Sequence, residues 1–184
     1  MNRFITSLAL FALAPTLSFA QATSTAPAPS TSPVADAIRA SLTNYSKNMT
    51  AAADAMPADK FAFKPTPEQN SFAHLSLHIS QSNYAFCSKI GGVADPDVPK
   101  LTDTDSKDKL VAALKTSFDF CSTALAKVDD SHLAESMPLF NNQNASRASI
   151  ILTLARSWAD HYSAQSMYLR LNGLLPPTAQ PAAH

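Results

Sequence analysis

The chain has 184 residues, and its 14 basic side chains balance 14 acidic ones. This length suits one domain, and the balanced charge excludes a broad basic surface for nucleic acid and a polybasic membrane patch. With only 3 glycines against 13 prolines, the composition disfavours a β-rich domain, which needs turn glycines, and favours helices with marked ends.

The first twenty residues have the pattern of a secretory signal peptide. A basic start at Arg3 precedes an apolar run at 5–13, and small residues lead to a predicted cleavage site after Ala20. The run is short for a bilayer span and Pro15 interrupts it, although a retained N-terminal anchor is the alternative. We therefore expect an exported protein, periplasmic or secreted, with no membrane association after cleavage.

Export changes the interpretation of the two cysteines, Cys87 and Cys121. In an oxidising compartment an even number of cysteines favours a disulfide, and each of these lies on a separate predicted helix. Such a bridge would stabilise the fold by roughly 3–4 kcal/mol in the chain-entropy treatment. The alternative is a pair of buried free thiols, which core packing also tolerates.

Four stretches carry apolar residues at helical spacing. The predicted helices span residues 34–56, 71–90, 107–128 and 146–172. Ser106 is the expected N-cap of the third helix, and Gly173 ends the fourth. The segment before the fourth helix is expected to be irregular, with one helical turn near His132. Four amphipathic helices of about twenty residues predict an all-α four-helix bundle.

The segments around the helices set the domain organisation. Residues 21–33 are rich in Ala, Ser, Thr and Pro and are predicted to form a flexible linker, because they cannot bury enough apolar surface to offset their chain entropy. The bundle is expected at 34–177, followed by a disordered tail at 178–184. The connector at 57–70 is long enough to cross an end of the bundle, so helices adjacent in sequence need not be antiparallel neighbours.

A histidine on the fourth predicted helix is the main candidate for chemistry. His161 falls close to the midline of that helix's apolar face, where an unsatisfied imidazole would be costly. His78 lies on the flank of the apolar stripe of the second helix, and His74 precedes it by one turn. We expect a pocket between these two helices. Its other predicted lining residues are Ser157, Trp158, Ala164 and Gln165.

Several segments, taken in order, resemble those of the DinB-like proteins. They are FAFKPTP at 61–67, SFAHLSLHI at 71–79, NYAFC at 83–87, DHYSA at 160–164 and YLRLNGLLPP at 168–177. The likeness covers about 34–177, and the two cysteines are similar to those of an exported subgroup. The resemblance implies an up-down-down-up bundle, which the long connector between the first two helices would permit.

The resemblance also implies a metal site. DinB-like proteins commonly bind zinc or nickel through one histidine of the second helix and two, four residues apart, of the fourth. His78 matches the first ligand and His161 the last, but the remaining ligand falls at Ser157. The glutamine common three residues after the last ligand falls at Ala164, with Gln165 adjacent.

A catalytic metal usually has three protein ligands. The third would have to come from His74 or Asp160, and both point away from the best apolar face. Two other interpretations stay open. His78 and His161 can hydrogen-bond to each other or to water in a degenerate pocket, or His161 can act as a metal-independent acid or base.

The preferred hypothesis is an exported DinB-like protein whose histidine pocket binds an unidentified small molecule or a loosely held divalent metal. One alternative is a metal-dependent enzyme of the thiol S-transferase or hydrolase type. Another is a non-catalytic structural module that forms a homodimer. No nucleic-acid partner is expected.

Overall fold

A computed structural model describes residues 29–139 and 143–181, so the predicted signal peptide at 1–20 lies outside the described residues, as does most of the linker at 21–33. The main elements are α1 (Pro33–Ala55), α2 (Phe72–Gly91), α3 (Lys107–Leu125) and α4 (Arg147–Leu171). Within the described ranges, no helix is both long and apolar enough to cross a bilayer.

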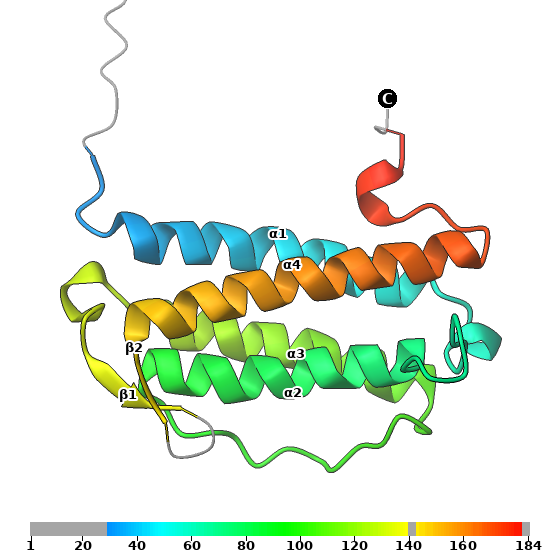
Figure 1. The fold of residues 1–184 in the computed structure, drawn as a ribbon, viewed down its shortest axis with the longest axis horizontal. Helices are drawn as coiled ribbons and strands as arrows, with labels where there is room; N and C mark the ends of the chain where they lie inside the picture. The colour runs from blue at the N-terminus through cyan, green and yellow to red at the C-terminus, as the bar shows by residue number, and fades with distance from the viewer. Residues whose placement is uncertain (1–28, 140–142, 182–184) are drawn as a thin grey trace, which may run out of the picture.

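The four helices form one bundle around a shared apolar core (Figure 1). α1 packs against α3 and α4, and α2 packs against the same two helices, so α1 and α2 occupy one diagonal. α1 and α4 run in one direction along the bundle, and α2 and α3 run in the other (Figure 1). The predicted all-α, up-down-down-up bundle is therefore confirmed.

Two connections produce this topology. The connector between α1 and α2, which contains η1 (Ala58–Lys60), crosses one end of the bundle to the diagonal position. The parallel arrangement of α2 and α3 depends instead on the segment 92–106, which returns along the length of the bundle (Figure 1). A helix of this size is ~30 Å long, and about fifteen extended residues reach ~50 Å, so this segment suffices. The expectation that the first connector permits the topology was therefore incomplete.

Helix ends are fixed by local caps and by one distant carboxylate. Ser71 Oγ accepts a hydrogen bond from His74 N at 3.0 Å at the start of α2, and Gly92 adopts φ 62° at its end. The Asp130 carboxylate accepts hydrogen bonds from the backbone amides of Val34 and Ala35 at 2.9 and 2.8 Å, so a residue distant in sequence caps α1. The side chain of Ser106 precedes α3 without capping it.

The region before α4 contains a helical turn, as predicted, and a hairpin that was not predicted. The turn is η2 (Asp130–His132). The hairpin pairs β1 (Ser136–Pro138) with β2 (Asn144–Ser146), antiparallel, with Met137 opposite Ala145. Strands of three residues are too short to show an alternating apolar pattern, so they could not be predicted from the sequence.

The C-terminal segment is ordered further than expected. η4 (Pro177–Ala179) follows α4, and the Tyr162 hydroxyl donates to Thr178 Oγ1 at 2.9 Å and accepts from Thr178 N at 3.1 Å. The predicted tail at 178–184 therefore begins with residues held against α4. Residues 182–184 lie outside the described ranges.

The predicted disulfide joins α2 to α3. Cys87 and Cys121 are bonded, with their Cα atoms 5.1 Å apart, and both are fully buried. One turn beyond Cys87, Gly91 faces the carbonyl oxygen of Ala124, and a Cβ built on Gly91 would lie 2.5 Å from it. The absence of a side chain at Gly91 therefore allows the two helices to approach this closely.

Candidate functional site

An open groove of about 460 Å³ runs between α2 and α4. The two helices converge there because both bury an apolar face in the same core. Residues of α2 and α4 line the groove: His78, Gln81, Ser82, Ala85, Phe86, Thr153, Arg156, Ser157, Asp160 and His161. The groove therefore contains both predicted histidines.

His78 and His161 face each other across this groove. Their ring centroids are 5.0 Å apart, with the ring planes inclined by 43°. His161 is half-buried and His78 is exposed. The expectation that His161 lies near the midline of the buried face was wrong, because Trp158, which is 1% exposed, occupies that position and His161 lies at the edge.

The backbone of α4 determines which nitrogen of the neutral His161 ring carries the hydrogen. His161 Nδ1 lies 2.5 Å from the carbonyl oxygen of Ser157 and 3.2 Å from Ser157 Oγ. A carbonyl oxygen can only accept, so Nδ1 carries the hydrogen, and in the neutral ring Nε2 keeps its lone pair. The i and i+4 spacing of Ser157 and His161 on one helix makes this contact local. His161 Nε2 is therefore an acceptor.

His78 is also biased towards its neutral form. Although the residue as a whole is exposed, partial burial of its ring in the groove lowers the pKa of His78 below the ordinary 6.5, and the charges of His161 and His74 lower it further. Its Nε2 lies 3.5 Å from Ser82 Oγ, one turn along α2. Near neutral pH the groove therefore presents two imidazoles, and that of His78 is uncharged.

The two weaker metal-ligand candidates do not complete this pair. His74 stacks on His78 with centroids 6.4 Å apart, but its Nδ1 lies 3.5 Å from Asp103 Oδ2, on the 92–106 segment. Asp160 lines the groove as an exposed side chain. Across 29–139 and 143–181, no three His, Cys, Asp or Glu side chains are grouped so that they could hold a metal ion. With Ser157 where the resemblance places a ligand, the donor set does not fit a three-ligand centre.

The structure places three other predicted pocket residues away from the groove. Trp158 donates from Nε1 to Asn83 Oδ1 at 2.8 Å in the core, and Gln165, fully buried, donates from Nε2 to the Met49 carbonyl at 3.4 Å. Ala164 is half-buried and packs on the core. These residues lie on the part of α4 that is enclosed by neighbouring helices, so their prediction as pocket residues was wrong. Only Ser157 of that set lines the groove.

Other groove residues were missed by sequence reasoning. Ser82 lies one turn after His78, and Thr153 lies two turns before His161, so helical spacing was a signal for both. Arg156 adds a guanidinium at the edge, and no salt bridge to it is formed by the described residues. The groove thus combines two imidazoles, three hydroxyls, a cation and a carboxylate.

Family membership follows from comparison with known proteins. The profile of the DinB superfamily matches residues 41–163, which is most of the bundle. This chain belongs to the DinB superfamily. The matched region contains both His78 and His161 of the groove. No curated protein matches the chain in sequence.

Solved structures share the DinB fold at low sequence identity. A DinB-like protein from Bacillus subtilis is 19% identical with a TM-score of 0.64, and the match covers 80% of this chain and 99% of that one. A DinB-like protein from Bacillus cereus is 15% identical with a TM-score of 0.64, covering 77% and 95%. A mycothiol-dependent maleylpyruvate isomerase is 11% identical with a TM-score of 0.56, covering 70% of this chain and 59% of the isomerase.

Proposed function

We propose that this DinB-superfamily protein binds a small polar ligand in the α2–α4 groove, through a hydroxyl or thiol hydrogen donated to His161. The observation that carries the proposal is the contact of His161 Nδ1 with the Ser157 carbonyl at 2.5 Å. It leaves Nε2 as an acceptor, and it holds the ring in one orientation before any ligand arrives.

The rest of the groove suits such a ligand. A neutral imidazole that accepts a hydrogen bond can also accept the proton, so His161 is positioned to act as a general base towards a hydroxyl or thiol. The uncharged ring of His78, 5.0 Å from that of His161, adds a second hydrogen-bonding group. Arg156 can pair with an anionic part of the same ligand, because guanidinium groups match carboxylates in geometry.

A low-molecular-weight thiol is the ligand class that we favour. The isomerase of similar fold is mycothiol-dependent by name, which makes a thiol the natural first candidate. A metal-dependent thiol S-transferase or hydrolase remains less well supported, because two imidazoles and a serine hydroxyl do not make the three-ligand site that a catalytic metal needs. The proposed binding therefore relies on the side chains alone.

We further propose that the protein works outside the cytoplasm. The buried disulfide between Cys87 and Cys121 supports this, because disulfides persist in oxidising compartments and are rare where thiols are kept reduced. The apolar run at 5–13 and the small residues before Ala20 point the same way. N-terminal sequencing of the protein recovered from the periplasm or medium would test the cleavage site.

The ligand proposal can be tested with reduced glutathione and S-methylglutathione, in which a methyl group replaces the thiol hydrogen. Amide shifts in two-dimensional NMR spectra would be followed during titration of the protein with each compound. We expect glutathione to perturb residues that line the groove, and S-methylglutathione to bind more weakly because it cannot donate to His161 Nε2. His161→Gln should remove the difference between the two compounds.

His132→Gln is the matched control, because His132 lies in η2, outside the set of groove residues. It should bind both compounds as the wild type does. Zinc chloride and nickel chloride titrated into the wild type, His161→Gln and His132→Gln would test the metal alternative directly. Tight, stoichiometric metal binding that His161→Gln abolishes would contradict the metal-independent proposal.

A further inference from the structure

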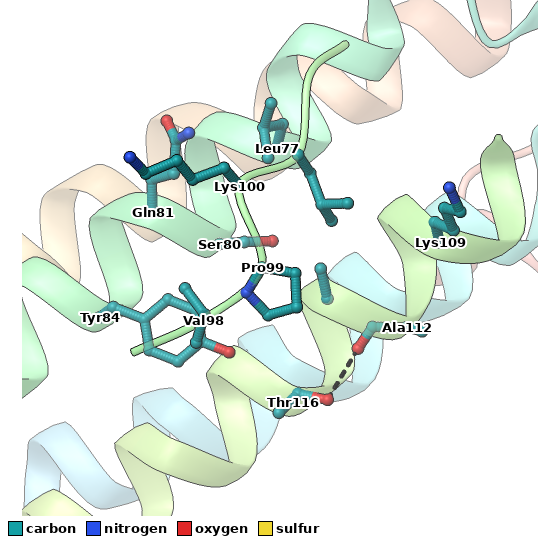
Figure 2. Close-up of a pocket in the computed structure, with 12 residues that line it drawn as sticks. Leu77, Ser80, Gln81, Tyr84, Val98, Pro99, Lys100, Lys109, Ala112 and Thr116 are labelled. Atoms are coloured by element: carbon teal, nitrogen blue, oxygen red, sulfur yellow. Dashed lines mark hydrogen bonds between the residues drawn. The ribbon is translucent and has the colours of Figure 1, made fainter. Parts of the chain in front are cut away.

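A second and larger cavity lies on the other side of α2, separate from the histidine groove. It has a volume of about 800 Å³ and is enclosed by α2, α3 and the segment 92–106, which crosses over it (Figure 2). This volume falls within the ~300–1,000 Å³ of typical small-molecule sites. Among the described residues, Gln81 alone lines both this cavity and the histidine groove.

The interior of this cavity is apolar. Leu77 and Tyr84 of α2 and Ala113 of α3 face it, and Val98, Pro99 and Leu101 cover it from the crossing segment. Three hydroxyls lie along its wall, on Ser80, Tyr84 and Thr116, and those of Ser80 and Thr116 are satisfied within their own helices. Ser80 Oγ donates to the Ser76 carbonyl at 3.1 Å, and Thr116 Oγ1 donates to the Ala112 carbonyl at 3.0 Å (Figure 2). A ligand in the interior therefore gains by burying apolar surface.

The polar groups lie at the ends of the cavity. Lys109 Nζ is 3.0 Å from Asp105 Oδ1, so its charge already has a partner. Lys100 forms no salt bridge with any residue of the described ranges, and Figure 2 shows it with Gln81 at the end opposite Lys109. An unpaired ammonium and a side-chain amide, next to an apolar interior, are complementary to an anionic group attached to an apolar body.

The crossing segment is built so that it can adjust to an occupant. Between residues 94 and 101 the described structure contains no backbone hydrogen bond to α2 or α3. The segment is instead tied to α2 near its two ends, where Val93 N donates to the Ser88 carbonyl and Asp103 Oδ2 lies 3.5 Å from His74 Nδ1. Packing of Val98, Pro99 and Leu101 is therefore what covers the cavity, and such contacts can shift without breaking a hydrogen bond.

From this arrangement we propose that the cavity between α2, α3 and the 92–106 segment binds an amphiphilic carboxylate. The apolar body lies under Val98 and Pro99, and the carboxylate lies at the end formed by Lys100 and Gln81. This site is distinct from the histidine groove: the two share Gln81, but neither Lys100 nor the α3 wall takes part in that groove.

Decanoate and decanol are suitable probes, because they share an alkyl chain and differ in the charged head. Calorimetric titration of the full mature protein with decanoate should give one site, with decanol binding more weakly. Lys100→Met should weaken decanoate binding about two- to fivefold, as expected for a partly exposed ion pair, and should leave decanol unchanged. Lys47→Met, the same change at an exposed position of α1, should have no effect on either.

A second variant tests the apolar part of the site. Thr116→Phe places a ring into the cavity from an exposed position of α3 and should weaken both probes about tenfold or more by occupying the space. Thr123→Phe is the matched control, because Thr123 is an exposed residue of the same helix with the same type of backbone contact, to the Asp119 carbonyl, and does not line the cavity. It should bind as the wild type does.

Three results would overturn the proposal. These are no binding of decanoate, equal loss of binding in Thr116→Phe and Thr123→Phe, or decanoate binding that Lys100→Met leaves unchanged. His161→Gln separates this site from the groove, because decanoate affinity should be retained in that variant whether or not the groove binds a thiol.

Discussion

The indole Nε1 of Trp158 donates a hydrogen bond to Asn83 Oδ1 at 2.8 Å in the centre of the bundle, where α4 meets α2. Both residues are almost completely buried. Asn83 also donates from Nδ2 to Ser117 Oγ at 3.0 Å, and Ser117 Oγ donates to the Leu114 carbonyl at 2.7 Å. One asparagine therefore links three helices through polar groups that are all satisfied.

Replacing this asparagine should destabilise the fold. Asn83→Leu keeps the size of the side chain but leaves the Trp158 N–H buried without an acceptor, at a cost of about 1–3 kcal/mol in the free energy of unfolding. Urea denaturation monitored by far-ultraviolet circular dichroism would measure it. Asn44→Leu, at an exposed position of α1, should change the free energy by less than about 0.5 kcal/mol.

The double variant shows whether the hydrogen bond is the cause. Asn83→Leu combined with Trp158→Phe removes donor and acceptor together, so its loss of stability should be smaller than the sum of the two single losses. Strictly additive losses would mean that Asn83 acts through packing alone, and the role assigned to the hydrogen bond would be wrong.

Removing the disulfide should lower stability through the unfolded chain. Cys87 and Cys121 are 34 residues apart in sequence, and opening a loop of that size costs roughly 3–4 kcal/mol in the chain-entropy treatment. We expect Cys87→Ala with Cys121→Ala to unfold at lower urea concentration than the oxidised wild type. When dithiothreitol is present, the urea midpoint of the wild type should approach that of the variant. The midpoint of the variant should not respond to the reductant. Identical midpoints for wild type with and without reductant would contradict this.

The bundle and the ends of α2 and α4 could be predicted because their causes are local in sequence, whereas α3 ends at Leu125 and not at the predicted residue 128. Regular apolar spacing defined the four helices, and Gly92 and Gly173, with φ of 62° and 74°, end α2 and α4 at the predicted positions. The cap of α1 could not be predicted, since its acceptor, Asp130, lies about a hundred residues away in sequence. The path of the 92–106 segment could likewise not be predicted, because it depends on the relative direction of α2 and α3.

The candidate site was predicted only in part, for a related reason. Helical spacing brought His78 and His161 to facing positions, and their rings do face each other. Which part of α4 is most buried depends on where α1 and α2 lie around it, and the sequence of α4 alone does not contain that information. Trp158 and Gln165 therefore turned out to be core residues, and His161 lies at the edge of the groove.

Gly91 should not tolerate alanine, although alanine ordinarily favours a helix. A Cβ on Gly91 would lie 2.5 Å from the Ala124 carbonyl oxygen, so α2 and α3 would have to separate next to the Cys87–Cys121 bridge. We expect Gly91→Ala to lower the free energy of unfolding by about 1–3 kcal/mol, opposite in sign to the gain of roughly 1 kcal/mol at an unobstructed helical site.

The neighbouring glycine provides a control with a different mechanism. Gly92→Ala introduces a left-handed alanine at φ 62°, with no atom within 4 Å of the added Cβ. Its cost should be about 1–2 kcal/mol from backbone strain alone. Disulfide formation, measured by mass spectrometry of the unreduced protein, should be slowed during refolding in Gly91→Ala and unchanged in Gly92→Ala. A stabilised Gly91→Ala would show that the helices are less closely packed than described.

The titration of His78 should make the stability of the fold depend on pH. Its pKa is lowered in the folded protein, first by burial and then by the charges of His161 and His74, so the unfolded chain binds this proton more tightly than the folded protein does. Between the folded pKa and the ordinary 6.5 the unfolded state therefore holds more protons, and stability rises as the pH rises through that window. Above it this contribution is constant, and acidification removes stability.

Two-dimensional NMR of the imidazole resonances should place the His78 midpoint below 6.5, and His161→Gln should move it upwards by removing the charge of His161. His132→Gln should leave the midpoint where it is. A His78 midpoint above 6.5, or one that does not respond to His161→Gln, would mean that the two rings do not interact across the groove.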